Sequence, residues 1–385
     1  MFCAAHAFSM ACDSLYVAWL KVHFTYELYV TMLKLYDEKK NTDKISSIIS
    51  EMKRYKGISL FSGKFGQDNR EWLIDKEHST ISQSISSVKY MSKQSAEDLY
   101  KLGQQDEAYI GSEFTSNVYT PEAKKAIAAI NKKLKPLQKK AEAMLAQNVD
   151  EFDPEFLELY GKGYPLEQEL KKIESAPESY QERAREIRHT AKMDCFTNVL
   201  RAIQMNTCLD TRQIEILIQL NYFESFGKTG KLMQVYNCFF NGEKKLTKTI
   251  KSFEERLAEC RRYEQSLSNI ELPAGLRLRS EHENIGICLS TDPAAPSNAY
   301  FVTALDDKYS IRVKLYSIKR GTVGEVRISK KLYKPMAEGS CIMIDQYKKS
   351  PKYSYSKGQR TIVPGEQEIW VTDYHVMQKG EANIA

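Results

Sequence analysis

The chain has few of the residues that bind structural metals. It contains six histidines and eight cysteines in 385 residues, and no two cysteines form a C-x-x-C pair. A structural zinc site needs thiolates or imidazoles at close, regular spacing, so this distribution argues against one. We therefore expect the cysteines to be free, buried thiols of a protein in a reducing cytoplasm.

Long apolar runs are also missing. No stretch reaches the roughly 18 consecutive apolar residues that a membrane span requires. The first residues lack the basic region of a signal peptide, and Asp13 interrupts the apolar run that follows them. The sequence thus predicts a cytoplasmic protein without a membrane partner.

Familiar catalytic motifs are absent as well. The sequence has no P-loop, no G-x-G-x-x-G, no G-x-S-x-G and no H-E-x-x-H. Carboxylates are numerous, yet none forms the spaced cluster that a two-metal site needs. No catalytic residue, no metal ligand and no cofactor is therefore assigned to this chain.

What the chain does contain is ordinary globular material. At 42% hydrophobic and 28% charged residues it can bury sizeable cores, and its length predicts two or three domains. The net charge of +6 permits a polyanionic partner without requiring one.

Helical periodicity dominates the first two-thirds of the sequence. Residues 8–36 contain no proline or glycine and predict one long helix or two. The segment 58–82, with several glycines, is expected to be extended or looped with short strands. Pro273-Ala274-Gly275 has the composition of a linker. Further helices are predicted over 43–55, ended by Gly57, over 85–102 as two short helices, over 192–203 and over 244–267.

The region 120–190 differs in composition from its surroundings. Lys, Glu, Ala and Leu dominate the stretch "PEAKKAIAAINKKLKPLQKKAEAML", which favours a solvated helical hairpin with Pro136 kinking its first arm. The lysine run 132–140 has two interpretations: a contact with nucleic acid, or a solvated helix face.

After Asn284 the pattern changes to period two. In "YFVTALDDKYSIRVKLYSIKRGTVGEVRIS" apolar and charged residues alternate, and later runs at 340–347 and 368–374 add strands. Five or six short antiparallel strands predict a small barrel, with the OB-fold as the leading candidate.

This module carries a basic, aromatic surface pattern. Residues 284–376 contain 14 Lys and Arg against 9 Asp and Glu, a net charge of +5. Bases stack on aromatic rings while cations follow the phosphates, so the pattern favours binding of single strands. The alternative is that many of these tyrosines simply pack within strands. The candidate single-strand DNA-binding residues are Tyr309, Arg312, Lys314, Tyr316 and Arg327.

The stretch "ILIQLNYFESFGKTGKLM", residues 216–233, predicts two short helices around a hairpin. Two glycines allow close backbone approach, and the bare N–H groups at a helix start attract a phosphate. The alternative is a plain helical hairpin with a glycine C-cap. The candidate DNA phosphate-binding residues are Gly227, Lys228, Thr229, Gly230 and Lys231.

The order of these parts resembles a known family. "HAFSMACDSLYVAWLKVHFTYELY" is similar to the fingers segment of the bacterial and phage C-family DNA polymerases, the polymerase III alpha subunits, with Thr25 in place of the family's proline. "NTDKISSIISEMKRYKGISLFSGKFGQDNREWLID" and "ISQSISSVKYMSKQSAEDLYKL" resemble the next helix and a first helix-hairpin-helix that lacks its usual glycines. "LDTRQIEILIQLNYFESFGKTGKLM" resembles the second helix-hairpin-helix, and the family's OB domain follows. The resemblance covers residues 1–110 and 190–376.

The resemblance implies a DNA-binding C-terminal portion of a replicative polymerase. In that family the palm, whose aspartates bind Mg²⁺ for nucleotidyl transfer, precedes the fingers, so this chain alone is expected to be inactive. His6, Tyr16 and Lys21 become candidates for the nucleotide side of the fingers. The implied partners are duplex and single-stranded DNA, the rest of the polymerase and a sliding clamp. Gln234-Val235-Tyr236 begins like a clamp-binding peptide but lacks its aliphatic-aromatic ending.

The expected fold is α+β, mainly helical in its N-terminal two-thirds, followed by an OB-like barrel. A different function remains open: a non-catalytic nucleic-acid-binding adaptor with the same modules. The predicted domains are the end of the fingers (1–56), an extended linker with the first degenerate helix-hairpin-helix (57–110), the lysine-rich helical insert (111–190), the second helix-hairpin-helix with its trailing helix (191–275) and the OB-fold domain (276–385).

Overall fold

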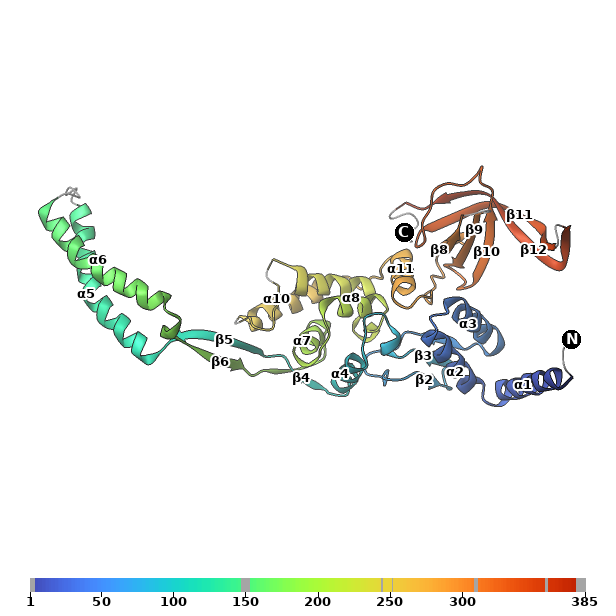
Figure 1. Ribbon diagram of the computed structural model, residues 1–385, viewed down its shortest axis with the longest axis horizontal. Helices are drawn as coiled ribbons and strands as arrows, with labels where there is room; N and C mark the ends of the chain where they lie inside the picture. Colours follow the sequence, from blue (N-terminus) through green and yellow to red (C-terminus); the bar gives the residue numbers. More distant parts are fainter. Residues whose placement is uncertain are drawn as a thin grey trace. The chain divides into compact units, whose positions relative to one another are not determined.

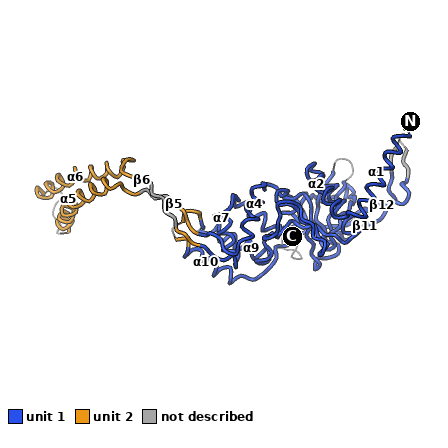
Figure 2. The backbone as a smooth tube through the Cα atoms, turned by 90° about the horizontal axis from the view of Figure 1, so that it is seen from below, with its two compact units in different colours: residues 1–110, 190–246, 254–385 blue, residues 111–189, 247–253 orange. Residues whose placement is uncertain are grey.

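The structure of the chain, a computed structural model, is of the α+β type (Figure 1). It describes residues 4–146, 153–243, 245–250, 252–307, 311–356 and 359–378. The chain forms two compact units (Figure 2). The first comprises Met1–Ile110, Thr190–Leu246 and Glu254–Ala385, and the second comprises Gly111–His189 and Thr247–Phe253.

The first unit begins with three helices, α1 (Ala4–His23), α2 (Thr25–Glu38) and α3 (Thr42–Lys56). The region 8–36 therefore forms two helices. The Asn41 side chain caps α3 by accepting a 3.1 Å hydrogen bond from the Lys44 N–H, and Gly57 ends it with φ of 67°. The end at Gly57 was predicted, and Asn41 at the start is a short polar residue of the kind that usually caps a helix.

A small sheet packs against α2 and α3. Its strands β1 (Ser59–Phe61), β2 (Leu73–Asp75) and β3 (Thr80–Ser82) lie in the order β1-β3-β2, with β1 and β3 parallel. Leu33, Met52 and Ile81 are fully buried in the shared core. The predicted extended segment 58–82 is thus confirmed as short strands.

The centre of the first unit is helical, and two predicted boundaries are wrong. The helix predicted over 244–267 begins only at Phe253, and Ala274 and Gly275, predicted as a linker together with Pro273, already belong to the next helix. The described elements here are α4 (Lys93–Gly103), β4 (Glu107–Tyr109), β7 (Thr190–Lys192), α7 (Phe196–Asn206), α8 (Thr211–Gln219), α9 (Thr229–Tyr236), α10 (Phe253–Ser266) and α11 (Ala274–Asn284).

The C-terminal module is a five-stranded sheet. Antiparallel pairing joins β8 to β9, β9 to β10, β8 to β11 and β11 to β12, and β10 pairs with β12 in parallel, so the ladder closes on itself. Val302, Val313 and Ile342 are fully buried within it. The strands are β8 (Ala299–Asp306), β9 (Ile311–Ser317), β10 (Val323–Ile328), β11 (Cys341–Ser356) and β12 (Gln359–Val376).

The second unit is a two-stranded ribbon that continues into a helical hairpin. Strands β5 (Ser112–Tyr119) and β6 (Tyr180–Ile187) pair over their whole length, and helices α5 (Pro121–Ala146) and α6 (Pro154–Ser175) lie side by side beyond them (Figure 1). The Ser112 hydroxyl lies 2.9 Å from the carbonyl oxygens of both Lys248 and Ile250, which joins the distant segment to this unit. The helical hairpin was predicted, and the ribbon was not.

Candidate nucleic-acid interface

The predicted phosphate site lies where α9 begins. A short 3₁₀ turn, Glu224–Phe226, leads to Gly227, whose φ of 146° is a conformation that favours glycine. Helix α9 then begins at Thr229, after Lys228 in an extended conformation. The N-terminus of α9 presents backbone N–H groups, which is the geometry that the sequence predicted for an anion.

These donors are already used by the chain itself. The Lys228 N–H donates to Asn269 Oδ1 at 2.8 Å, and the Lys231 N–H donates to the Ile270 carbonyl oxygen at 3.1 Å. The Thr229 hydroxyl donates to Glu271 Oε2 at 2.7 Å. The connection between α10 and α11 therefore occupies the position that a phosphate would take.

Gly230 confirms how close this contact is. A Cβ atom placed on Gly230 would lie 2.7 Å from the Ile270 carbonyl oxygen and 2.9 Å from the Glu271 carbonyl carbon and oxygen. Thr229 and Gly230 are both buried, which leaves no room for a nucleic acid. These contacts argue against the phosphate role predicted for Gly227, Thr229 and Gly230, because Gly230 allows close approach of the protein's own backbone.

The two lysines of the predicted site, Lys228 and Lys231, are more accessible to solvent than the buried Thr229 and Gly230. Lys228 is exposed and Lys231 is half-buried. A hollow of about 360 Å³ next to them is lined by Lys64 and Lys228 but also by Glu224 and Glu271. Two cations beside two carboxylates give this hollow no net preference for an anion, and Lys64 forms an ion pair with Glu224.

A second helix start nearby is also capped internally. The carboxylate of Glu264, on α10, accepts hydrogen bonds of 2.8 Å from the N–H groups of Phe196 and Thr197 and one of 2.6 Å from the Thr197 hydroxyl. Glu264 is 5% exposed. A buried carboxylate at the N-terminus of α7 satisfies the donors and the helix dipole together. The segment around residues 264–271 thus closes both α7 and α9 to outside anions.

The loop predicted as the hairpin of the first helix-hairpin-helix is held in the same way. Tyr90 has φ of 67°, and its carbonyl oxygen accepts a 2.6 Å hydrogen bond from the Gln213 side chain on α8. The Arg212 guanidinium lies over the Tyr90 ring at 4.0 Å from its centroid. A strained tyrosine fixed by α8 replaces the glycine that such a hairpin would otherwise need.

On the five-stranded C-terminal sheet, some candidate residues are accessible to solvent, whereas others already form contacts within the chain. Arg312 is exposed on β9, opposite Arg327 on β10. Lys314, two positions along, forms a 2.7 Å ion pair with Asp43 of α3. Because the Asp43 side chain is 74% exposed, a polyanion can replace the carboxylate at little cost. Arg312 and Lys314 therefore remain candidates, while Tyr309 lies outside the described residues.

The other two barrel candidates are occupied. Arg327 forms a 2.7 Å ion pair with Glu368 of β12, in which both side chains are less than 20% exposed, and lies over the Trp370 ring. Tyr316 is 3% exposed and donates from its hydroxyl to the Ser290 carbonyl oxygen at 3.0 Å. Neither can meet DNA without breaking these contacts, which argues against their predicted single-strand role.

The structure exposes a group of residues that the sequence argument did not choose. Tyr347 is 58% exposed on β11, and Lys348, Lys349 and Lys352 beside it are also exposed. They lie on the long hairpin that β11 forms with β12. The sequence does contain a signal, an aromatic residue followed by two lysines, but it does not indicate how long this hairpin is.

The fingers candidates lie on α1, and the structure does not bring them together. His6 and Lys21 are fifteen positions apart, about 22 Å along the helix at 1.5 Å per residue. Tyr16 is 64% exposed and stacks on Trp19 at a centroid distance of 6.2 Å. Lys21 forms an ion pair with Glu51 of α3, and this hydrogen bond holds the pKa of the Glu51 carboxyl below its usual value.

Helix α1 has no buried residue at all. Among its exposed side chains, Phe8 is 73% exposed, Leu15 72% and Val22 60%. These three residues recur at intervals of seven, so they share one face of the helix, and an apolar face of this kind normally packs against other protein. Exposed apolar surface of this extent marks an interaction site.

Within the part of the chain that the structure describes, no group of three His, Cys, Asp or Glu side chains is placed to hold a metal ion. In the same residues no helix has the length and apolar character of a membrane span. The seven cysteines among them are free, and three of the seven are buried. Comparison with family models, with curated proteins and with solved structures found no match to this chain.

Proposed function

We propose that this chain is the DNA-binding C-terminal portion of a C-family replicative polymerase, whose complete enzyme also contains the palm. The observation that carries the proposal is the connectivity of the C-terminal sheet. Its five strands join in the order β8-β9-β10-β12-β11 and back to β8, with only β10 and β12 parallel. This order supports an OB-fold, whose second and third strands and long loops bind oligonucleotides.

The basic side chains of the sheet support the same function. In an OB-fold the second and third strands correspond here to β9 and β10, where Arg312 is exposed. The loop between the fourth and fifth strands corresponds to the β11–β12 hairpin, where Tyr347 and Lys349 are exposed. A cation that follows the phosphates and a ring on which a base stacks are the two parts of a single-strand site.

The exposed helix α1 favours a polymerase portion over a self-sufficient adaptor. Its apolar side chains are those of the segment that resembles the fingers, and in a complete polymerase the neighbouring helices would enclose them. An adaptor that acts alone leaves these side chains unexplained. Template-directed nucleotidyl transfer with Mg²⁺ would then be the reaction of the complete enzyme, and DNA binding the contribution of this chain.

The first prediction concerns activity. The purified chain should leave a primed template unextended with dNTPs and either Mg²⁺ or Mn²⁺, because the proposal places the metal-binding carboxylates outside residues 1–385. The same preparation should shift that primed template in a binding assay. A full-length C-family polymerase serves as the positive control. Templated extension by this chain alone would contradict the proposal, and so would failure to bind DNA.

The second prediction concerns the barrel. Arg312→Ala should weaken binding of a single-stranded oligonucleotide and make the plot of log affinity against log salt shallower by about 0.7, because one phosphate contact is lost. Lys331→Ala, at an exposed lysine outside β9 and β10, is the matched control and should leave the slope nearly unchanged. Fluorescence anisotropy at several salt concentrations measures both. Equal slopes for the two variants would place the single-strand site elsewhere.

A further inference from the structure

The helical hairpin of the second unit has its charges separated between its two helices. Helix α5 carries seven lysines and two glutamates, whereas α6 carries three lysines and five glutamates. A hairpin that needs charge only for solubility would have both signs mixed on each helix. This separation makes α5 a basic surface in its own right.

The lysines of α5 are exposed and uncommitted. All seven are exposed, and within the described residues none of them forms an ion pair. The helix faces α6 through other residues, since Ala123, Ile130 and Leu134 are buried. The seven lysines are Lys124, Lys125, Lys132, Lys133, Lys135, Lys139 and Lys140.

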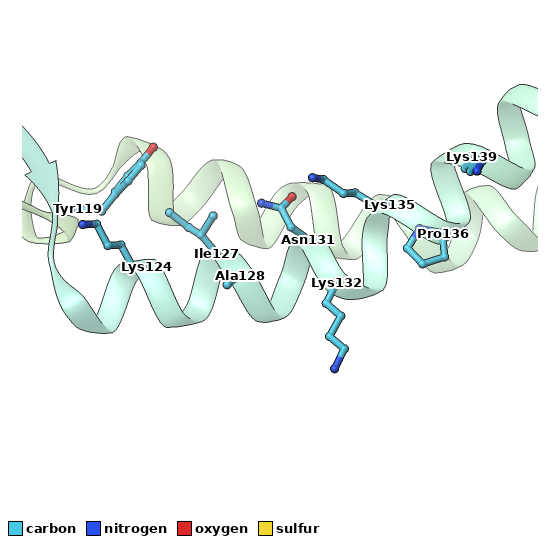
Figure 3. Close-up of a pocket in the computed structure, with 9 residues that line it drawn as sticks. All are labelled: Tyr119, Lys124, Ile127, Ala128, Asn131, Lys132, Lys135, Pro136 and Lys139. Atoms are coloured by element: carbon cyan, nitrogen blue, oxygen red, sulfur yellow. The ribbon is translucent and has the colours of Figure 1, made fainter.

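Four of these lysines line an open groove of about 790 Å³ along α5 (Figure 3). Lys124, Lys132, Lys135 and Lys139 are among its nine lining residues, and no lining residue is acidic. Figure 3 shows the Lys135 side chain along the upper edge of α5 and the Lys132 side chain extending below the helix. The remaining side chains between them are apolar, apart from Asn131 and the Tyr119 hydroxyl.

The groove is suited to a row of phosphates. At 1.5 Å per residue, Lys124 and Lys139 lie about 22 Å apart along the helix axis. That distance spans about six nucleotides of one strand of a duplex, at 3.4 Å each. The lysines therefore match an extended polyanion better than one small anion.

The groove lacks what a single strand would need. Its one aromatic side chain, Tyr119, stacks on Tyr180 with ring centroids 4.8 Å apart and planes at 29°. A ring that is already stacked in this way is a poor platform for a base. Phosphate contacts without base stacking are the mode in which proteins bind a duplex independently of sequence.

We propose that the α5 groove binds the phosphate backbone of double-stranded DNA, as a second DNA contact separate from the barrel. The choice of DNA as the polyanion rests on the proposed function, while the charge separation and the groove do not. Because both contacts belong to one chain, DNA bound at one of them would be present at a high effective concentration for the other.

A matched pair of triple variants tests the proposal in the full chain. Replacing Lys132, Lys135 and Lys139 with glutamine removes three groove lysines. Replacing Lys125, Lys133 and Lys140 with glutamine removes the same charge from the same helix outside the groove. With a blunt duplex of random sequence, the groove variant should lower affinity at least tenfold. Its salt slope should become shallower by about 2.7, or 0.9 for each phosphate contact. The control should change the slope by less than one.

Protection from acetylation gives an independent readout. A saturating duplex should protect Lys132, Lys135 and Lys139 from an amine-reactive reagent more than it protects Lys125, Lys133 and Lys140. Poly-L-glutamate is the competing probe for an acidic protein partner. Equal affinity losses in the two triple variants would overturn the proposal, as would protection by poly-L-glutamate but not by DNA. If the unmodified chain binds single strands but no duplex, the proposed duplex contact of the groove is wrong, whereas the proposed function is not contradicted.

Discussion

Gly230→Val is expected to destabilise the first unit by about 3 kcal/mol, the upper range for forcing extra atoms into packed structure. The valine Cβ would lie 2.7 Å from the Ile270 carbonyl oxygen and 2.9 Å from two atoms of Glu271. These are backbone atoms, which cannot move aside as a flexible side chain can. Movement of the segment would also break the 3.1 Å hydrogen bond that the Lys231 N–H donates to Ile270.

Chemical denaturation of the two proteins, with hydrogen exchange at the α9 amides, measures this effect. Gly161→Val is the matched control, because a Cβ on Gly161 meets no atom within 4 Å. Gly161 lies inside α6, where valine has a better helix propensity than glycine, so the control should not lose stability. A Gly230→Val protein with unchanged stability but lost duplex affinity would contradict the internal contact and restore the phosphate site.

The case of Gly230 shows why the site was harder to predict than the fold. The sequence signal was sound, since two glycines beside a helix start do indicate close backbone approach. The glycine pattern did not identify which part of the molecule makes this close approach. The partner is the segment Asn269–Glu271, about forty residues further along the chain, and no local pattern relates the two. A long-range contact of this kind depends on how α10 and α11 pack, which periodicity does not encode.

The fold elements that were predicted share a local cause. Helix α3 could be located because Asn41 and Gly57 signal its two ends within the sequence itself. The closed sheet could be expected because its strands alternate apolar and charged residues, as in Ile311 to Leu315. In helix α3 and in the closed sheet, the residues that identify the element are close together in the sequence.

The elements that were missed lack such a local signal. The ribbon of β5 and β6 pairs only with itself, and its sequences Ser112–Tyr119 and Tyr180–Ile187 contain too few apolar residues to alternate. Their composition merges with that of the charged helices between them. Before α11, Pro273 was predicted to belong to a linker, because proline occurs both in linkers and at the starts of helices.

Glu264→Ala is the other substitution with a large expected effect, for a related reason. Its carboxylate accepts the N–H groups of Phe196 and Thr197 and the Thr197 hydroxyl, all buried, so alanine would leave three donors without partners. Each unsatisfied buried donor costs about 1–3 kcal/mol. Allowing for relaxation around the shortened side chain, we expect a loss of about 3 kcal/mol in the free energy of unfolding of the first unit.

The control for this prediction lies on the same helix. Glu255, in the first turn of α10, is exposed, and Glu255→Ala should cost no more than about 1 kcal/mol through the helix dipole. Hydrogen exchange adds a local measurement, because the Phe196 and Thr197 amides should lose protection in Glu264→Ala and keep it in Glu255→Ala. Unchanged exchange at these amides would mean that α7 does not depend on the Glu264 cap. Fast exchange there without any gain in duplex affinity would support the conclusion that this helix start stabilises the fold and does not bind DNA.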